Sequence, residues 1–507
     1  MVRVRFAPAP TGLMHLGNVR TALMNYLFAR QKQGTLVIRI EDTDQQRNFD
    51  PGAHQILKDL AWLELSFQEG PGKGGPYEPY FQSQRTAIYQ EKLNHLITTQ
   101  KIYRCFCTAE DLEKKRQRQV ALKLPPRYDR TCLQLSPTDL QKNLHDKLPF
   151  IWRIKLPAQG TVIINDIARG NIQFDLKNFS DAPLTRQDGS FTFLFANFVD
   201  DFVMRITHIF RGEDHLTNTA IQAMLYAAFE QELPTYWHMP IICNAQGKKL
   251  SKRDFGFSLV DLQQGGYLPE AICNYLGIIG GSFVTEIMSL ADLAKTTDFT
   301  ALSTAGQIKY DVEKLTWVNH QWITLCDPLK LAQHCLPFLT PSFPQAASMD
   351  INVLAKLLQT IKSDLQTLKD CPQQLHFYFV RPQFDVLELE KHVTASAHNA
   401  IKELVCSHIA DINNPELFVQ NLKAAAKTQN IPLKDLFVWL RMALTGQPHG
   451  PAIHELIIML GIEESQNRIQ ILCKWSTAFH TTQWPSGAVD VKTVPSWLKA
   501  RFNVLQQ

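Results

Sequence analysis

The sequence predicts a doubly wound α/β domain that is split by an α+β insertion and followed by an all-α region. Strand-like and helix-like segments alternate over residues 1–102 and 189–258, the alternation stops over 103–188, and the pattern beyond residue 326 is helical. Strands that alternate with helices are typical of a parallel sheet covered by helices, in which ligands collect at the carboxyl ends of the strands.

Length and composition indicate a globular protein of several domains. The chain has 507 residues, whereas one domain usually has about 100–200. Its net charge is only +4, so any basic surface must be local. No apolar run approaches the roughly 18 residues of a membrane span, and the N-terminus lacks the pattern of a signal peptide. The ten scattered cysteines predict a cytoplasmic protein with reduced thiols rather than a disulfide framework.

The first segment predicts a strand, a tight turn and a helix. Apolar and basic residues alternate over residues 2–6, and prolines at 8 and 10 then end the strand because proline has no backbone N–H. From residue 19 the apolar residues have the spacing of one helical face. His15, Gly17 and Asn18 are therefore expected at a helix N-terminus, where free N–H groups and the helix dipole attract phosphate.

The α/β pattern continues with a strand and a second helix. The apolar residues 36–40 predict a buried parallel strand with Glu41 at its carboxyl end. Asp50 and Pro51 are favoured residue types for the N-cap and the first position of a helix, so the second helix is expected to begin there. Glu41 is thereby a candidate binding residue, and a solvated loop carboxylate is the alternative.

The second half of the α/β pattern supplies two strands and a basic loop. The apolar residues 203–210 predict a strand that places Arg211 and Asp214 at its carboxyl end. Residues 239–243 predict another strand, which leads into a lysine-rich loop over 247–253. Taken alone, such a loop is usually a solvated surface feature.

Two of these segments together resemble the paired signatures of class I aminoacyl-tRNA synthetases. His-Leu-Gly-Asn at 15–18 corresponds to the first signature, and Lys-Leu-Ser-Lys-Arg at 249–253 corresponds to the second. Three further stretches narrow the resemblance to the bacterial type of glutamyl-tRNA synthetase: residues 5–12, 39–44 and 211–215. The similarity covers nearly the whole chain and is densest over residues 3–320.

The resemblance implies a role for each part of the chain. Residues 1–102 and 189–258 would form a Rossmann-like, nucleotide-binding catalytic domain, and 103–188 an insertion that binds the acceptor end of tRNA. The insertion is locally basic, with nine Lys or Arg against four Asp or Glu between residues 101 and 132, which suits RNA. Residues 259–325 would form a helical stem-contact domain and 326–507 an anticodon-binding domain in two helical parts. Without the resemblance, the last region would be interpreted as a helical protein-binding domain.

The implied reaction joins L-glutamate to the 3′ end of tRNA-Glu through a glutamyl-adenylate. ATP and Mg²⁺ are required, and the enzyme is expected to be a cytoplasmic monomer. The glutamate carboxylate is already a nucleophile at pH 7, so catalysis consists of orientation and charge stabilisation. The positive potential is expected from His15, Lys249 and Lys252 with the helix N-terminus. The implied ATP-binding residues are His15, Gly17, Asn18, Asp214, Lys249, Ser251 and Lys252, of which His15, Asn18, Lys249 and Lys252 are the catalytic candidates.

Glutamate itself carries two carboxylates and one ammonium, so its site requires two fixed cations and one acceptor. The resemblance assigns these roles to Arg5, Arg211 and Glu41. Arginine stays charged when desolvated and holds a carboxylate through two parallel hydrogen bonds. Which arginine binds which carboxylate stays open. The implied glutamate-binding residues are Arg5, Ala7, Glu41, Phe193, Asn197 and Arg211.

The sequence departs from the family at several positions. Ala9 and Phe193 replace the usual serine and tyrosine, which removes two hydroxyl contacts to the amino acid. His376, an anticodon candidate together with Arg441, replaces an arginine that is typical of members specific for tRNA-Glu. Members without that arginine can also charge tRNA-Gln, so a non-discriminating or tRNA-Gln-directed enzyme is an alternative. An inactive RNA-binding relative is less favoured because the signature residues are intact.

A possible zinc knuckle lies in the insertion. Cys105, Cys107, Tyr128 and Cys132 resemble a zinc site of some family members, in which a closed tetrahedral ion would hold the basic hairpin. Other members have no metal, and a set of buried thiols is the alternative.

Overall fold

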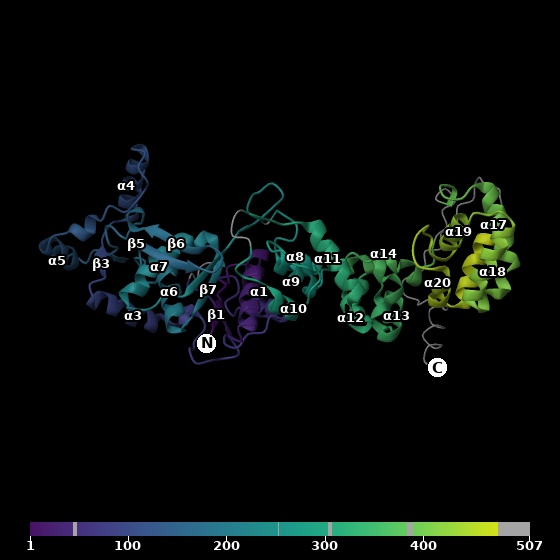
Figure 1. The fold of residues 1–507 in the computed structure, drawn as a ribbon, viewed down its shortest axis with the longest axis horizontal. Helices are drawn as coiled ribbons and strands as arrows, with labels where there is room; N and C mark the ends of the chain where they lie inside the picture. Colours follow the sequence, from purple (N-terminus) through teal and green to yellow (C-terminus); the bar gives the residue numbers. More distant parts are fainter. Residues whose placement is uncertain (44–47, 252, 303–306, 383–388, 475–507) are drawn as a thin grey trace. The chain divides into compact units, whose positions relative to one another are not determined.

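The computed structural model describes residues 1–43, 48–251, 253–302, 307–382 and 389–474 (Figure 1). The chain divides into two units, of which the first comprises Met1–Gln263 with Pro269–Val318 and the second Gln264–Leu268 with Asn319–Gln507. Among the described residues, no helix combines the length and the apolar character that crossing a membrane would require.

Parallel strand pairs form the centre of the first unit. β1 (Arg3–Phe6) pairs with β2 (Thr35–Ile38), and β7 (His208–Gly212) pairs with β8 (Thr235–Met239), both in parallel. β1 also packs against β7, and α1 (Leu16–Gln31) packs against β1, β2 and β7. The predicted fold class, a doubly wound α/β domain followed by a helical region, is confirmed.

Helix α1 is enclosed on nearly all sides, although its sequence predicted a single apolar face. Besides its apolar residues it buries Arg20 and Asn25, because α9 (Pro269–Ile278) and α10 (Leu290–Thr296) pack on it as well. Arg20 Nη2 donates to the Ile279 carbonyl at 3.3 Å, one residue beyond the end of α9. A cation at that position satisfies a free carbonyl and complements the helix dipole.

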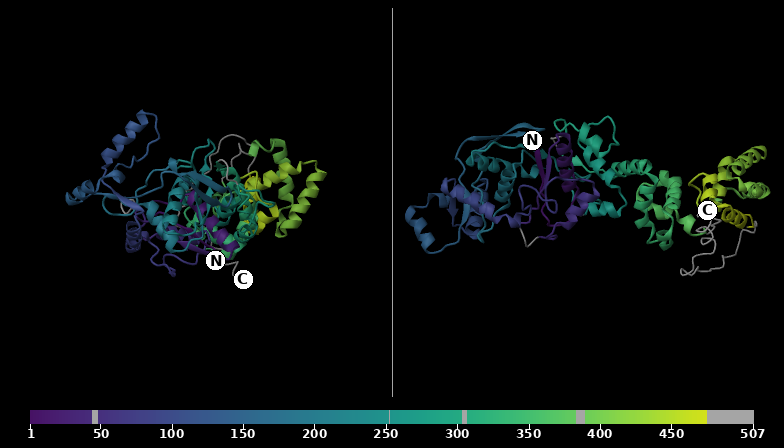
Figure 2. Two further views of the ribbon diagram at one scale, coloured as in Figure 1. Left: turned by 60° about the vertical axis from the view of Figure 1, so that its left-hand side comes forward. Right: turned by 90° about the horizontal axis from the view of Figure 1, so that it is seen from below.

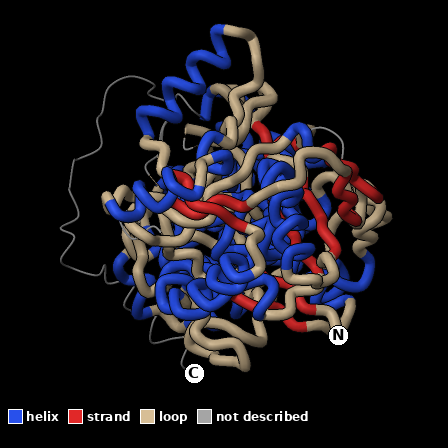
Figure 3. Tube along the Cα trace, turned by 90° about the vertical axis from the view of Figure 1, so that its left-hand side faces the viewer, coloured by secondary structure: helices blue, strands red, loops and turns tan. Residues whose placement is uncertain are grey.

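The insertion begins after α3 (Thr86–Thr98) and consists of helices and antiparallel strands. β3 (Ile102–Cys105) pairs antiparallel with β4 (Ile151–Ile154). Between them lie α4 (Ala109–Ala121) and the short α5 (Pro137–His145). α4 buries none of its residues. Figure 3 shows that α4 projects from the neighbouring elements.

A second hairpin of the insertion extends the parallel sheet. β5 (Thr161–Asp166) pairs antiparallel with β6 (Gly170–Asp175), and Asp166 pairs in parallel with Tyr236 of β8. The strand order is therefore β6-β5-β8-β7. The insertion thus contributes the end of one of its strands to the sheet that carries Arg211.

The predicted start of the second helix is wrong. α2 spans His54–Trp62, and Ala53 before it adopts a left-handed conformation with φ 52°, so residues 51–53 form a turn. Asp50 still stabilises the helix, because its Oδ2 accepts the N–H of Gln55 at 2.8 Å.

Two predicted strands also have different bounds. The apolar run over 203–210 is divided between the end of α6 (Phe193–Val203) and the start of β7, because Arg205 adopts a left-handed turn conformation with φ 54°. The run over 239–243 is divided between β8 and β9 (Ile242–Cys243), since the intervening Pro240 has no N–H to donate to a strand ladder. After β7 the chain forms α7 (Leu216–Ala228).

Residues 259–325 are mainly helical, as their sequence predicted. They contain α8 (Leu259–Gln264), α9, α10 and α11 (Val312–Leu325), and β10 (Ile308–Lys309) pairs in parallel with β9.

The described part of the second unit consists of helices without strands, drawn green to yellow in Figure 2. In chain order beyond α11 these are α12 (Pro328–Leu339), α13 (Ile351–Ile361), α14 (Cys371–Gln374), α15 (His376–Phe379), α17 (Ala395–Ser407), α18 (Pro415–Thr428), α19 (Leu433–Thr445), α20 (Ile453–Leu460) and α21 (Ile462–Lys474).

Cys406 of α17 lies beside Cys473 of α21, with 6.9 Å between their Cα atoms, and the other eight cysteines form no disulfide. The expectation of a protein with reduced thiols stays a prediction. The two cysteines are 67 residues apart in the sequence and meet because α17 packs against α21, a contact that residue spacing does not reveal.

Candidate active site

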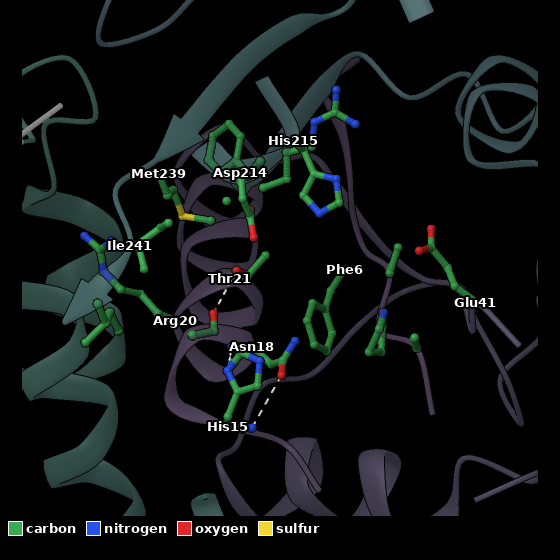
Figure 4. Close-up of a pocket in the computed structure, with 18 of the residues that line it drawn as sticks. Phe6, His15, Asn18, Arg20, Thr21, Glu41, Asp214, His215, Met239 and Ile241 are labelled. Carbon is green, nitrogen blue, oxygen red and sulfur yellow. Dashed lines mark hydrogen bonds between the residues drawn. The ribbon is translucent and has the colours of Figure 1, made fainter. Parts of the chain in front are cut away.

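A cavity of about 620 Å³ lies at the N-terminus of α1 and the carboxyl ends of β1 and β7 (Figure 4). Its volume is within the range of about 300–1,000 Å³ that is usual for small-molecule sites. Both predicted signatures line it, the first through His15, Gly17 and Asn18 and the second through Lys249 and Leu250. The predicted glutamate-binding residues line the same cavity: Arg5, Ala7, Glu41, Phe193, Asn197 and Arg211.

Backbone pairing brings the two signatures together. The chain that follows the lysine loop forms an antiparallel bridge with the first signature, between Ser258 and His15. Leu16 N–H donates to the Phe257 carbonyl at 3.0 Å, and Leu259 N–H donates to the Met14 carbonyl at 2.9 Å. The rings of His15 and Phe257 are also 5.4 Å apart. The loop is thereby tied to the start of α1 although more than two hundred residues separate them.

His15 is the N-cap of α1. Its Nδ1 accepts the Asn18 N–H at 3.2 Å, and Asn18 Oδ1 accepts the His15 N–H at 3.4 Å (Figure 4). Because Nδ1 is an acceptor, the proton of the neutral ring lies on Nε2. A Cβ atom at Gly17 would be 3.0 Å from two ring atoms of His15, so a larger residue would press on the imidazole.

His15 is a hydrogen-bond donor rather than a source of charge. Burial, reinforced by the nearby charge of Lys249, lowers the pKa of His15 below its ordinary value of 6.5. The imidazole is therefore neutral at pH 7. A neutral imidazole contributes to the positive potential through its Nε2–H, and the full charge near it belongs to Lys249. The predicted role of His15 at the phosphates stays a prediction.

The lysine loop presents exposed charges to the cavity. Lys249 Nζ is 3.3 Å from Asp214 Oδ2, and the two side chains are 64% and 48% exposed. Ser251 is exposed and does not line the cavity; its N–H and Oγ both bond to Asp254 Oδ2 at 2.9 Å. Lys252, a predicted catalytic residue, lies outside the described residues.

The other end of the cavity has a buried network of charges. Arg5 Nε is 3.1 Å from Asp201 Oδ1, and Arg5 Nη1 donates to the Phe210 carbonyl at 3.2 Å. Arg39 bridges two carboxylates, with Nη1 at 2.7 Å from Asp201 Oδ1 and Nη2 at 3.1 Å from Glu41 Oε1. All of these side chains are buried, which is tolerable because each charge has a partner of opposite sign.

Glu41 is held by an amide as well as by arginine. Asn197 Nδ2 donates to Glu41 Oε1 at 2.5 Å, and Gln222 Nε2 fixes this amide by donating to Asn197 Oδ1 at 3.1 Å. Burial raises the pKa of Glu41 against the opposing effect of Arg39 and Arg5. A cation that entered the cavity beside Glu41 would relieve this burial cost.

Arg211 differs from the other two arginines. Its Nη2 donates to Thr219 Oγ1 at 2.5 Å, but its Nε and Nη1 are buried without a hydrogen-bond partner among the described residues. Burial lowers the pKa of Arg211. The cavity thus contains a desolvated arginine with donors available for an acidic ligand.

The two departures from the family pattern are visible in the lining of the cavity. Phe193 packs its ring 5.5 Å from that of His215, whose pKa is lowered to about 4 by burial and by Arg211. Ala9 lines the cavity and is exposed. Neither side chain offers a hydroxyl.

Several residues around the cavity were not predicted from the sequence. Arg39, Asp200 and Asp201 form the buried charge network, and Arg39 Nε is 3.5 Å from Asp200 Oδ2. Two signals were available: a charged residue inside an apolar strand run, and two adjacent carboxylates inside the otherwise apolar α6. Charged residues in such positions are rarely buried unless they are paired.

The cysteine cluster of the insertion has the composition of a metal site. The sulfur atoms of Cys105, Cys107 and Cys132 all lie within 4.8 Å of one another. The Tyr128 hydroxyl is 3.3 Å from Cys105 Sγ and 3.9 Å from Cys107 Sγ. Three thiolates with a fourth oxygen donor suit Zn²⁺, so the residues fit the predicted ion.

The predicted anticodon residues lie in the second unit. His376 is in α15, exposed, with its ring 5.9 Å from that of Phe343. Arg441 is in α19, and its Nε donates to the Pro451 carbonyl at 3.3 Å. α15 packs against α19, so both residues belong to one helical group.

Comparisons with known proteins agree with this geometry. Residues 1–317 match the family "tRNA synthetases class I (E and Q), catalytic domain", and residues 330–473 match "Anticodon binding domain". The glutamate–tRNA ligase of Moorella thermoacetica is 34% identical over 94% of this chain and 98% of its own. That of Clostridioides difficile is 35% identical over 92% and 98%. The crystal structure of a glutamate tRNA ligase from Elizabethkingia meningosepticum in complex with its amino acid superposes with a TM-score of 0.82 at 32% identity, covering 93% of this chain and 99% of that chain.

Proposed function

Because the chain belongs to the class I tRNA synthetases for glutamate and glutamine, we propose that it ligates L-glutamate to tRNA at the expense of ATP. One observation carries the proposal. A single cavity is lined at one end by both class I signatures and at the other by two arginines and a buried glutamate, which suit an acidic amino acid.

The charges of the cavity match those of glutamate. Arg5 and Arg211 each bind one of its carboxylates through charge-assisted hydrogen bonds, and Glu41 accepts its ammonium group. Asn197 holds Glu41 in place for this contact. Glutamine would leave one arginine without a carboxylate in a desolvated site, which is the physical basis for rejecting it.

The nucleotide is proposed to occupy the end that the signatures form. The N–H groups at the start of α1, the Nε2–H of His15 and the ammonium of Lys249 stabilise charge on its phosphates. The apolar lining residues suit an adenine ring; they include Met239, Ile241, Ile242 and Leu250. Mg²⁺ enters with ATP, and Asp214 offers a carboxylate at this end. The α-carboxylate of glutamate then attacks the α-phosphorus and releases pyrophosphate.

The glutamyl group passes from the adenylate to the 3′-terminal ribose of tRNA. The basic insertion with its projecting α4 supports binding of the acceptor end. His376 and Arg441 support a role of the helical region with the anticodon. Because His376 replaces an arginine typical of tRNA-Glu-specific members, charging of tRNA-Gln is the second candidate activity. We expect the enzyme to be a cytoplasmic monomer.

Pyrophosphate exchange and charging assays test the proposal. Purified protein should exchange pyrophosphate into ATP with L-glutamate in the presence of tRNA-Glu, and much less with glutamine or aspartate. It should also transfer labelled glutamate to tRNA-Glu. Charging of tRNA-Gln in parallel assays would establish the non-discriminating alternative. Binding of tRNA without any exchange would instead identify an inactive RNA-binding relative.

We further propose that Cys105, Cys107, Tyr128 and Cys132 hold a structural Zn²⁺ ion. The convergence of three sulfur atoms and one phenol oxygen supports it. Metal analysis of protein purified without chelators should return one zinc per chain, and Cys107→Ala should lose it. Protein that binds no zinc even after dialysis against the metal would refute this site.

A further inference from the structure

Arg211 is the first member of a hydrogen-bond chain that leads away from the cavity. Its Nη2 bonds to Thr219 Oγ1 at 2.5 Å, and Thr219 Oγ1 is 2.7 Å from His238 Nε2. His238 Nδ1 in turn is 2.9 Å from Asp166 Oδ2. All four side chains are buried, with Thr219 and His238 both 0% exposed.

The direction of each bond follows from its end groups. Arginine only donates, so Thr219 Oγ1 must accept from Arg211. The Asp166 carboxylate only accepts, so the ring proton of His238 lies on Nδ1. Burial lowers the pKa of His238, which keeps the ring neutral and leaves Nε2 as an acceptor. The Thr219 hydroxyl therefore donates to His238 Nε2 at 2.7 Å, the shorter of its two contacts, the other being the His215 carbonyl at 3.2 Å. Every bond of the hydrogen-bond chain then points toward Asp166.

Asp166, the last member of the hydrogen-bond chain, accepts hydrogen bonds from three backbone N–H groups. Asp166 Oδ1 accepts the N–H groups of Ala168 and Arg169 at 3.1 and 3.0 Å, and its Oδ2 also accepts the His238 N–H at 2.9 Å. Arg211 and His238 are register partners on β7 and β8, and Asp166 ends the adjacent β5. The hydrogen-bond chain therefore runs across the three neighbouring strands β7, β8 and β5, and Thr219 of α7 links Arg211 to His238.

This arrangement contrasts with that of the other arginines in the network. Arg5 and Arg39 are in direct contact with Asp201, which neutralises much of their charge. Within the described parts of the chain, Arg211 forms no ion pair, and its only carboxylate connection runs through two neutral groups. A direct ion pair takes up a guanidinium donor and part of the charge, as at Arg5 Nε, whereas a neutral relay orients the guanidinium of Arg211 and leaves its charge uncommitted.

We propose that Thr219, His238 and Asp166 are positioning residues that hold Arg211 in the orientation needed to bind a carboxylate of the amino acid. This inference rests on the proposed function, because it presupposes that the cavity binds glutamate. Because Asp166 belongs to the insertion, the proposal also gives the insertion a part in binding the amino acid.

The matched variants Thr219→Val and Thr219→Ser test the chain. Valine has nearly the shape of threonine but cannot accept from Arg211, whereas serine keeps the hydroxyl. Loss of one buried hydrogen bond to a charged group predicts a rise in the KM for glutamate of roughly 10- to 100-fold in pyrophosphate exchange. The KM for ATP should stay near that of the wild type, whereas the thermal unfolding midpoint should fall modestly because Arg211 Nη2 and His238 Nε2 lose a buried partner. Thr219→Ser should restore the KM for glutamate to within about threefold of the wild type, since a hydroxyl again links Arg211 to His238.

A second variant separates a positioning role from a merely structural one. His238→Gln retains an acceptor near Nε2 but loses the link to Asp166, so it should raise the KM for glutamate as well. Because both variants interrupt the same chain, the double variant should be no worse than Thr219→Val alone. Additive effects, an equal rise in both KM values, or identical behaviour of the valine and serine variants would each overturn the proposal.

Direct titration of glutamate by calorimetry distinguishes the two levels of inference. Wild-type protein that binds glutamate, together with a Thr219→Val variant that binds it equally well, refutes the positioning chain and leaves the proposed function intact. Wild-type protein that neither binds glutamate nor supports exchange refutes the proposed function and the positioning chain with it.

Discussion

The two ends of the cavity use charge in opposite ways. At the end proposed to bind the amino acid, the side chains of Arg39 and Asp201 are 0% and 1% exposed and lie 2.7 Å apart. At the end proposed to bind the nucleotide, the side chains of Lys249 and Asp214 are 64% and 48% exposed and lie 3.3 Å apart. The first pair is part of a closed network, whereas the second is a single contact screened by water.

This difference corresponds to two kinds of recognition. An acidic amino acid is distinguished from its amide by charges that are fixed and desolvated before it arrives. A triphosphate whose charge shifts during the reaction is better served by a point charge on a flexible stem, such as a lysine. Substitutions at the amino-acid end should therefore lower the stability of the fold, whereas substitutions at the nucleotide end should slow the reaction.

Removing the buried carboxylate tests the first half of the comparison. Asp201→Ala removes the carboxylate beside the buried Arg5 and leaves Arg39 with Glu41 and Asp200, which is expected to destabilise the first unit by about 3–5 kcal/mol. Thermal denaturation followed by circular dichroism should show an earlier transition for this unit. Asp175→Ala is the control, because the side chains of Asp175 and Lys177 are 41% and 67% exposed, so losing their pair and the bond from the Lys177 N–H should lower the midpoint far less. Equal effects of the two substitutions would contradict a preformed network.

Removing the exposed lysine tests the second half. Lys249→Ala should slow pyrophosphate exchange by roughly 100- to 1,000-fold, the effect expected for one lost donor to developing charge. The unfolding midpoint should not change, because the Lys249 side chain is 64% exposed and its ion pair with Asp214 is solvated. Lys248→Ala is the matched control, since Lys248 is exposed in the same loop and does not line the cavity. A Lys249→Ala variant that loses stability but exchanges pyrophosphate at the normal rate would contradict the expected difference between the two ends.

The two ends also differed in how far the sequence revealed them. The nucleotide end depends on short contiguous segments, so a strand, a turn and a helix start were enough to place His15 and Asn18 at an N-terminus. The amino-acid end depends on contacts between residues far apart, such as Arg39 with Asp201, 162 residues away. A single sequence contains the types of these residues but not their pairing.

The predicted boundaries of helices and strands were wrong where the backbone conformation of one residue interrupts a regular sequence pattern. Ala53 and Arg205 adopt left-handed conformations that their residue types do not announce, and these turns displaced the predicted starts of α2 and β7. The neutral state of His15 could not be read from the sequence for a related reason. Its pKa depends on burial and on Lys249, which approaches only after the chain has folded.

The smallest expected effect concerns the protonation of His15, which is partly buried and lies near the exposed Lys249. Unfolded histidine has a pKa near 6.5, and burial lowers that of His15 in the folded protein. Its contribution to stability is therefore complete above the unfolded pKa and is lost as pH falls toward the folded pKa, when Nδ1 is protonated and can no longer cap α1. His15→Asn keeps a capping oxygen that does not titrate, so the wild type should lose about 1 kcal/mol relative to this variant between pH 7.5 and 5. Parallel unfolding curves across this pH range measure the difference. A constant difference would mean that folding leaves the pKa of His15 at its ordinary value.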